Sequence, residues 1–590
     1  MISKFLGLTT LSFISVSSGM IITSTANAQQ ALYLAYPPQN HKTTSDKIFL
    51  IGTASPQGKI TVNGQTIQRS NQGHFAPSFP LKLGVNRFVI RHNNKTINVT
   101  VTRNSITPNI PQSGGFADNS LIPKQSISAL PNTPVCFSAI ASPNAQVSVN
   151  IANQTIPLFP QPDLVELPAN SAILTDSNEP IINSITQYQG CTKFNTIGNL
   201  GTPNFQLKLN NKTIAQRGEG SVNIINPDQL KIVEIVVDAG VTRTGPSTNH
   251  SRLTPLPKGT IVSVIGQEGD WLKLDYGAWI KENETRTLPN LSSAKATIRS
   301  AKFDKNNEET KITFPLTLPV PVSINQMGNK VTLTLYNTTA ETDTIRLEYD
   351  PLVKSFYWQQ VSPDKIEYYL ELNPDQQWGY DLNYEGTNLV FTLRHPPKIE
   401  SQNSQPLKNI KILLDPGHGG DEWGAKGPNG YPEKSVNLVV STLLKQELLK
   451  RGATVYMTRE TDKDVSLQDR VTMINKVKPD IALSVHYNAL PDNGDAINTA
   501  GIGMFWYHPQ AEDLSKFLHD YLVEKANRPS YGVFWNNLAL TRPHITPSVL
   551  LELGFMINPT EFEWITDAQQ QKNLAATLAN GITEWFNQKK

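Results

Sequence analysis

The sequence predicts a multidomain protein in which N-terminal all-β modules precede a C-terminal α/β domain with a mostly parallel central sheet and helices on both faces. At about 150 residues per domain, a chain of 590 residues corresponds to about four domains. Up to residue 395, short alternating runs are separated by turns rich in proline and uncharged polar residues, which is typical of all-β modules. After Ile410 strand and helix patterns alternate, which is typical of an α/β domain.

The composition excludes several classes of protein. The chain has 52 basic and 50 acidic residues, a formal charge of +2, so it lacks the basic field that nucleic-acid binding requires. Hydrophobic residues make up 38% of the chain, too many for a disordered protein. Beyond the N-terminus the apolar runs are too short to span a bilayer, so we expect no membrane span after signal cleavage.

Residues 1–28 have the pattern of a signal peptide. Lys4 gives a positive start, residues 5–22 are apolar or small, and Ala26-Asn27-Ala28 supplies the small-residue cleavage pattern. The alternative is an uncleaved membrane anchor, which the Ser and Thr residues inside the stretch disfavour. We therefore expect an exported protein of the periplasm or the cell wall.

Residues 45–104 are predicted to form a small β domain. Asn63-Gly64 is a strong hairpin turn between alternating runs, and the segments 62–65, 73–75 and 83–86 resemble small bacterial immunoglobulin-like modules. Residues 105–134 are rich in Pro, Ser, Gly and Asn, and are predicted to be a linker.

A second β domain is predicted over 135–228, and it contains both cysteines of the chain. Cys136 and Cys191 would meet an oxidising environment after export, which favours a disulfide. The alternative is two buried free thiols. A zinc site built from them is disfavoured, because no paired Cys/His spacing accompanies them.

Residues 232–285 resemble a bacterial SH3-type (SH3b-like) barrel. The resemblance rests on Arg243-Thr244-Gly245-Pro246, on residues 256–260 and 269–274, and on Gly277-Ala278-Trp279-Ile280. It implies a module that binds cell-wall peptides, although Trp271 and Trp279 are interpreted as core aromatics. A further β-rich domain is predicted over 294–395, and a polar linker over 396–408.

The C-terminal domain is predicted over 409–587. Strands are expected at 411–414, 453–458, 481–486, 502–507 and 549–553. Helices are expected at 433–451, from Ser466, near 511–526 and near 560–587. Ser466-Leu467-Gln468-Asp469 resembles a capping box, and Gly452 is a C-terminal stop for the first helix.

Polar side chains follow or end three of these strands. His418 lies in Asp415-Pro416-Gly417-His418-Gly419-Gly420, His486 ends a strand, and Glu552 lies on the last one. Open parallel sheets form their sites at the carboxyl ends of strands, so these side chains can converge. Glu433, at the start of the first helix, adds a carboxylate at the same edge. Two histidines and one carboxylate make a suitable zinc site with an open position, beside a second carboxylate for proton transfer.

Each of these residues has a less specific interpretation when taken alone. A lone histidine is more often a surface or core residue, and a lone Glu in a strand is often an ion-pair partner. Among the other histidines of this domain, His519 is expected at the surface of a helix. His544 is a spare candidate because it shortly precedes the last strand.

Together the motifs resemble the zinc-dependent N-acetylmuramoyl-L-alanine amidase family (the Amidase_3 type) over about 409–586. Glu422 stands where the family usually has Asp, and Gly424-Ala425 follows as expected. The other matching blocks are Asn429-Gly430, Glu433 with Asn437-Leu438, Thr458-Arg459, Leu467 with Arg470-Val471, Ser484 to Ala489, and Glu552 to Phe555 with Asn558-Pro559.

The resemblance implies zinc ligands His418, Glu433 and His486, a general base in Glu552, and cleavage of the amide between N-acetylmuramic acid and L-alanine of peptidoglycan. It also implies that the domain over 294–395 resembles the β domains that localise such amidases in the envelope. The segment between Tyr487 and Ile502 is too short for the helical plug of some relatives. An envelope activator protein is a candidate partner.

Two questions stay open at this stage. Asp415 either orients His418, since metal-bound histidines usually need an acceptor, or caps local backbone. The function has two alternatives: a catalytically inert wall-binding scaffold, and a zinc peptidase that cuts within the stem peptide.

Overall fold

The structure is a computed structural model. It describes residues 32–589 apart from 106–108, 112, 113, 163, 169–171, 173–179, 184, 185, 290, 292, 293, 343, 347, 348, 374, 375 and 400–404. The predicted signal peptide lies outside the described residues. Among the described helices, none is long and apolar enough to cross a membrane.

The N-terminal β domain is built from ten strands around one apolar core. A five-stranded sheet has the order β2-β10-β9-β5-β6, and it faces a three-stranded sheet β1-β4-β7 and the pair β3-β8. Buried Ile48, Ile90 and Val101 lie in the core between them. The strands β1 to β10 are Tyr33–Tyr36, Asn40–Thr43, Lys47–Phe49, Ile51–Thr53, Ile60–Val62, Gln65–Thr66, His74–Phe75, Ser78–Pro80, Gly84–His92 and Lys95–Arg103.

The second β domain contains the disulfide. Cys136 and Cys191 lie opposite each other on the antiparallel strands β12 and β17, and their sulfur atoms are bonded. The main sheet has the order β12-β17-β14-β13-β19-β20. The strands β11 to β21 are Ile127–Ala129, Pro134–Ile140, Gln146–Ile151, Gln154–Pro160, Leu164–Glu166, Ile181–Asn183, Gln187–Lys193, Gly198–Gly201, Asn204–Leu209, Lys212–Arg217 and Val222–Ile224.

The next module is a small barrel that shares a sheet with the second β domain. Strand β11 pairs with β21 on one side and with β25 of the barrel on the other, within the order β18-β21-β11-β25-β22-β28. The strands β22 to β28 are Lys231–Ile235, Ala239–Gly240, Leu256–Pro257, Ile261–Glu268, Trp271–Leu274, Trp279–Lys281 and Thr285–Thr287.

The region predicted as a linker over 105–134 is therefore ordered over much of its length. Strand β11 lies within it, and Phe116 and Leu121 are buried in the core of the second β domain. The prediction was misled by composition, because the prolines and glycines of this stretch separate short segments that pack on the domain. Leu407, in the second predicted linker, is also buried, in the core of the C-terminal domain.

The fourth module is a β sandwich. Its sheets have the orders β30-β31-β38-β37 and β32-β33-β36-β35, and Phe314, Leu333 and Tyr368 are buried in its core. The strands β29 to β38 are Ala296–Ile298, Lys302–Lys305, Glu309–Pro315, Val322–Met327, Lys330–Tyr336, Thr338–Ala340, Val353–Ser362, Lys365–Leu372, Tyr380–Glu385 and Asn388–Arg394.

The C-terminal domain confirms the predicted α/β class. Its sheet has the order β40-β39-β41-β44-β42-β43, with parallel pairing throughout except between β42 and β44, so the sheet is mixed. The strands β39 to β44 are Lys411–Pro416, Thr454–Met457, Ile481–Asn488, Ile502–Trp506, Ser530–Trp535 and Ser548–Phe555. The helices α1 to α5 are Glu433–Lys450, Leu467–Val477, Glu512–Lys525, Pro559–Thr566 and Ala568–Gln588.

The helices cover both faces of this sheet. Along β39 successive side chains point to opposite faces. Ile412 and Leu414 pack with residues of α1 and α5, whereas Leu413 packs against Ile474 of α2 on the other face. The single helix predicted near 560–587 is divided into α4 and α5, because Asp567 accepts hydrogen bonds from the first amides of α5 and so begins a new helix.

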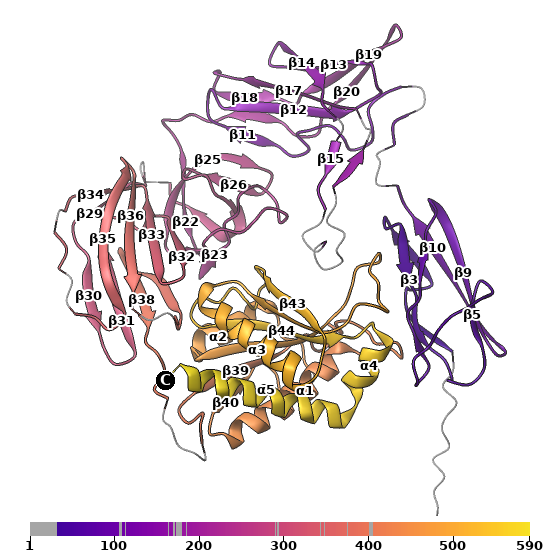
Figure 1. Cartoon of the computed structure of the whole chain (residues 1–590). Helices are drawn as coiled ribbons and strands as arrows, with labels where there is room; N and C mark the ends of the chain where they lie inside the picture. The colour runs from indigo at the N-terminus through magenta and orange to yellow at the C-terminus, as the bar shows by residue number, and fades with distance from the viewer. Residues whose placement is uncertain are drawn as a thin grey trace, which may run out of the picture.

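The chain closes on itself, since its first and last domains are in contact (Figure 1). The barrel contacts the sandwich through a hydrogen bond from the Ile261 amide to Pro319 O at 2.9 Å. The sandwich contacts the C-terminal domain through Arg394, whose guanidinium donates to Pro479 O at 2.6 Å. The N-terminal β domain in turn contacts the C-terminal domain, where the phenol of Tyr36 donates to Asp492.

Candidate active site

His418 lies in the loop after β39, in a backbone conformation that non-glycine residues rarely adopt. Its φ is 58°, in the left-handed region. Arg470 donates to the carbonyl oxygens of Pro416 and His418, at 2.9 and 2.8 Å, and so ties the loop to α2. Arg459 donates to Pro416 O and Gly417 O, each at 2.9 Å. These bonds fix the backbone of the loop, and a strained residue persists at a functional site when its surroundings fix it in this way.

Asp415, near the end of β39, supports the His418 loop by binding Arg470. Its carboxylate accepts hydrogen bonds from Thr458 Oγ1 at 2.5 Å, Arg470 Nη1 at 2.6 Å and Ser484 Oγ at 2.6 Å. Asp415 and Arg470 are 1% and 2% exposed, so this is a buried ion pair. All three bonds come from side chains, and Arg470, which donates to Asp415, also donates to His418 O, so Asp415 positions His418 indirectly.

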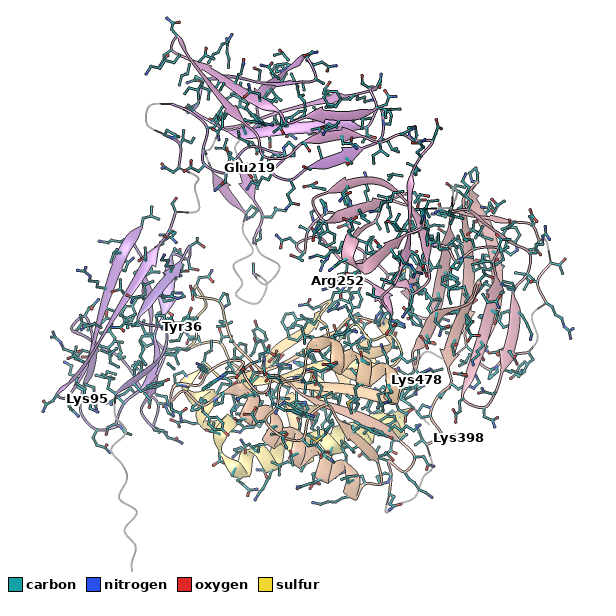
Figure 2. The ribbon with its side chains drawn as sticks, turned by 180° about the vertical axis from the view of Figure 1, so that it is seen from behind. Tyr36, Lys95, Glu219, Arg252, Lys398 and Lys478 are labelled. Carbon is teal, nitrogen blue, oxygen red and sulfur yellow. A yellow bond between two sulfur atoms is a disulfide. The ribbon has the colours of Figure 1, made fainter. Side chains whose placement is uncertain are left out.

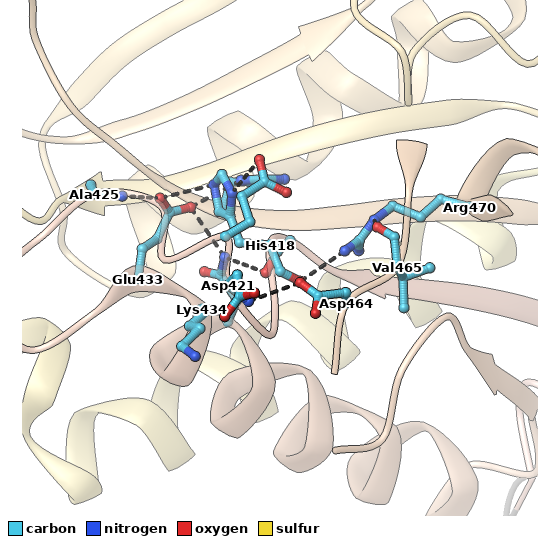
Figure 3. A network of polar contacts seen from close by, with 12 residues as sticks. His418, Asp421, Ala425, Glu433, Lys434, Asp464, Val465 and Arg470 are labelled. Carbon is cyan, nitrogen blue, oxygen red and sulfur yellow. Dashed lines mark hydrogen bonds and ion pairs between the residues drawn. The ribbon is translucent and has the colours of Figure 1, made fainter. Parts of the chain in front are cut away.

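Glu433 is the first residue of α1 and is buried beside the His418 loop (Figure 3). Its carboxylate accepts from the amides of Ala425 and Tyr487, at 2.8 and 3.1 Å, and from Asn437 Nδ2 at 3.1 Å. The helix N-terminus also favours a negative charge at this place. The orientation of the carboxylate is thus fixed by three donors from different segments.

His418, Glu433 and His486 meet at one point. His418 Nε2 lies 3.1 Å from Glu433 Oε2, and His486 Nδ1 lies 2.9 Å from Glu433 Oε1. The centroids of the two imidazole rings are 4.8 Å apart. Burial raises the pKa of Glu433, but the hydrogen bonds and charges of both histidines outweigh it and hold that pKa below its usual value.

The donor set fits a divalent cation of the zinc type. One ligand atom from each of the three residues lies within 4.8 Å of the others. Tetrahedral zinc with bonds of about 2.0–2.1 Å separates its ligand atoms by about 3.3 Å. Here the two histidine nitrogens lie 3.1 and 2.9 Å from the two oxygens of Glu433, so the cluster has the size of such a site. The other ring nitrogen of His418, Nδ1, lies 3.2 Å from Glu422 Oε1. A metal-bound histidine usually has such a carboxylate beside its second nitrogen.

Glu552 lies next to this cluster on the neighbouring strand. In the parallel pair β41–β44, His486 is in register with Glu552. Glu552 Oε2 is buried and has no hydrogen-bond partner among the described residues. Burial, and secondarily the charge of Glu433, raise the pKa of Glu552 well above its usual value. A carboxyl with one buried, unpartnered oxygen beside a group of metal ligands is suited to proton transfer.

Two glycines are required by the close packing of the cluster. A Cβ atom on Gly417 would lie 2.2 Å from Cε1 of His486. Gly424 has a φ of 67°, and a Cβ atom there would lie 2.4 Å from Glu433 Oε2. Any larger residue at either position would displace a ligand.

The remaining histidines lie elsewhere. His519, which we expected at the surface, is buried: its ring lies 2.8 Å from Asp520 Oδ1 and 2.9 Å from Ser530 Oγ. The reason is strand β43, which the sequence analysis did not predict and which packs against α3. The spare candidate His544 stacks on Tyr380 of the sandwich, with ring centroids 4.7 Å apart, and so belongs to a domain contact.

The sequence analysis did not assign the residues that hold the His418 loop. Thr458, Arg459 and Arg470 all lie in blocks that match the family, but their roles depend on contacts between segments far apart in the chain. The available signal was the pair of arginines itself, Arg459 just after β40 and Arg470 in the first turn of α2, because both lie in blocks that match the family.

Comparisons with known proteins identify two modules of the chain. Residues 412–584 match the family described as N-acetylmuramoyl-L-alanine amidase, and residues 243–285 match the bacterial SH3 domain. The chain is 33% identical over 231 residues to a probable cell wall amidase, LytH, of Staphylococcus epidermidis, covering 38% of this chain and 76% of the relative. It is 34% identical over 189 residues to LytH of Staphylococcus aureus, covering 32% and 62%.

The solved structure of the catalytic domain of CwlV, an N-acetylmuramoyl-L-alanine amidase from Bacillus (Paenibacillus) polymyxa var. colistinus, is 26% identical. The match covers 30% of this chain and 98% of that chain, with a TM-score of 0.29.

Proposed function

Because the chain belongs to the N-acetylmuramoyl-L-alanine amidase family, we propose that it is a zinc enzyme that hydrolyses the amide between N-acetylmuramic acid and L-alanine in peptidoglycan. The observation that supports this most directly is the meeting of His418, Glu433 and His486 beside Glu552. We infer export to the periplasm or the cell wall from residues 1–28, since the substrate lies outside the cytoplasm. An envelope protein that activates the enzyme is part of the same proposal.

In this mechanism His418, Glu433 and His486 would hold the zinc ion. When bound there, zinc would polarise the carbonyl oxygen of the substrate, lower the pKa of the attacking water and, through its charge, lower the pKa of nearby carboxyls such as Glu552. The loop held by Arg470 and Arg459 keeps His418 in place during the reaction. Ala425, Tyr487 and Asn437 keep the carboxylate of Glu433 directed at the two histidines.

Glu552 is the proposed general base and acid. Its unpartnered oxygen accepts a proton from the attacking water and then donates it to the amide nitrogen, which leaves as the free amine of L-alanine. The register with His486 sets the distance between the base and the metal ligands, and it is fixed by the β-ladder rather than by a loop. The SH3-type barrel is the proposed module for holding the wall peptide near the site.

The test uses the full chain and purified peptidoglycan. We expect stem peptides with a free N-terminal L-alanine, identified by mass spectrometry, and loss of their release on chelation. Glu552→Gln should keep its zinc, measured by elemental analysis, and lose about 10²–10⁴-fold in rate, the usual contribution of a general acid–base group. Glu512→Gln, on the surface of α3, is the matched control.

Three outcomes would contradict the proposal. Fragments cut within the stem peptide would indicate a peptidase. An intact wall after long incubation with the zinc-loaded protein would indicate an inert scaffold. Undiminished turnover of Glu552→Gln would remove Glu552 from its role.

A further inference from the structure

Three segments lead away from the edge of the sheet where the candidate site lies. The first, 419–432, follows His418, and the second, 489–501, follows strand β41 with His486. The third, 555–563, begins at the last residue of β44, the strand that carries Glu552. The N-terminal β domain contacts each of these segments, although more than 300 residues of other modules separate it from them in the chain.

The contact with the second segment is polar. The phenol of Tyr36 donates to Asp492 Oδ1, and His41 Nε2 lies 2.9 Å from Asp492 Oδ2. Figure 2 shows Tyr36 where the N-terminal domain meets the C-terminal one. Burial raises the pKa of Asp492, but hydrogen bonds from His41, Thr43 and Tyr36 outweigh it and keep that pKa below its usual value. The carboxylate is therefore charged and held by three side chains of another domain.

An apolar cluster surrounds this polar contact and extends to the third segment. Both domains contribute to it, and its buried members are Phe49, Ile51 and Ala76 from the N-terminal domain with Ala496, Phe555 and Ile557 from the C-terminal domain. Phe49, Ala496 and Phe555 are each at most 2% exposed. Phe555 lies three residues after Glu552, so the cluster lies close to the end of the strand that carries the proposed base.

The contacts with α4 link the third segment to the first. The rings of His74 and Phe562 pack edge to face, with centroids 5.1 Å apart, and the Gln72 amide donates to Glu563 Oε1 at 2.7 Å. Phe562 in turn packs so closely on Gly427 that a Cβ atom there would lie 2.0 Å from its ring. Tyr33 lies directly against Gly430 in the same segment.

We propose that the N-terminal β domain is a brace for the catalytic site, in which Tyr36 and His41 are positioning residues that act through Asp492 on the segment after His486. A plug would cover the ligands, yet with this domain docked the side chains of His418 and His486 remain 21% and 17% exposed. The contacts are made to the three segments that follow the ligands and Glu552 in the chain, not to the ligands themselves. This matches a domain that supports the segments around the substrate site.

The experiment compares the full-length protein with Asp492→Ala, Asp492→Asn and Tyr36→Phe. Hydrogen exchange followed by mass spectrometry should show faster exchange in 489–499, by about tenfold or more for Asp492→Ala, since hydrogen bonds to a charged group are lost. Exchange in the central strand β41 should not change. Asp492→Asn keeps the shape of the side chain and one acceptor oxygen. Its segment 489–499 should therefore exchange at a rate between those of the parent and the alanine variant.

The kinetic part of the experiment rests on the proposed function, whereas the exchange part does not. With a soluble muropeptide, kcat/KM of Asp492→Ala should fall about tenfold, in proportion to the lost support, with unchanged zinc content. Lys95→Ala, on the side of the N-terminal domain away from the contact in Figure 2, is the control and should match the parent in both measurements.

Three results would overturn the proposal. Exchange in 489–499 that does not respond to Asp492→Ala would show that the contact does not hold the segment. Faster exchange with unchanged kcat/KM would show that the segment is held without effect on the site. A rise in activity would show that the domain is a gate that restrains the enzyme.

Discussion

Replacing Arg470 by alanine tests how the fold supports the site. Arg470 and Asp415 lie 2.6 Å apart and are 2% and 1% exposed, so the variant leaves a buried carboxylate without its cation. The carbonyl oxygens of Pro416 and His418 lose the same donor. The perturbation thus acts on stability and on the position of a ligand at once.

The magnitude follows from the burial of the pair. Removing one partner of a buried ion pair costs about 3–5 kcal/mol. A domain of this size loses about 2–4 °C in melting temperature per kcal/mol, so the transition of the C-terminal domain should fall by about 6–20 °C. Affinity for zinc should fall by about 10–100-fold, the usual effect of losing a group that supports a metal ligand.

The assay is calorimetry of the full chain, in which the transition of the C-terminal domain is identified by its rise on zinc addition. Zinc affinity is measured by competition with a chelator. Lys445→Ala is the control: the Lys445–Glu460 pair is 27% and 64% exposed and should contribute no more than about 1 kcal/mol. If Arg470→Ala melted together with the parent protein and held zinc equally well, the reasoning would be refuted.

Three further predictions concern packing, the disulfide and pH. Gly417→Ala places a methyl group 2.2 Å from the His486 ring, so its zinc content should fall in elemental analysis; full zinc content in the folded variant would contradict the packing argument. Loss of the Cys136–Cys191 bond, which links positions 55 residues apart, should destabilise the second β domain by about 4 kcal/mol on the loop-entropy model. A Cys136→Ser/Cys191→Ser protein with an unshifted calorimetric transition would disprove it. Burial, and secondarily the charge of His544, lower the pKa of His508 from 6.5 to about 3, so between these values only the unfolded chain is protonated there. Stability should therefore be fully present above about pH 6.5 and fall on acidification by at most about 1.4 kcal/mol per pH unit. The free energy of unfolding, measured with urea, should change less with pH in His508→Gln than in the parent protein. An equal change in both proteins would show that another group causes the pH dependence.

The sequence predicts those parts of the C-terminal domain whose signals are local. The apolar spacing of α1 and the run of β41 each identify an element within a few residues of its observed limits. Strand β43 was missed because its side chains are mostly half-buried and do not alternate, and Gly532 interrupts it. The division between α4 and α5 depends on Asp567, whose capping bonds are a signal that apolar periodicity does not contain.

The candidate site shows the same limit. His418, Glu433 and His486 could be identified because each lies in a recognisable motif at the end of a strand or the start of a helix. The bond from Arg470 to Asp415 joins residues 55 apart, and the bond from Tyr36 to Asp492 joins residues 456 apart. Such pairings are set by how elements pack in three dimensions, so no local pattern indicates them.

Because the first and last domains of the chain are in contact and belong to one chain, they need only a weak affinity for each other to stay docked. Because the intervening modules tether the two domains, docking is an intramolecular step. Its effective concentration depends on how the modules hold the two faces, and about 1 mM is the value for a short flexible tether. Two isolated domains that associate with a Kd of about 1 mM would already be docked for about half of the time in the intact chain. A small contact that can open and close is thus sufficient here, and cleavage of the chain between these domains would weaken it without altering any residue at the contact.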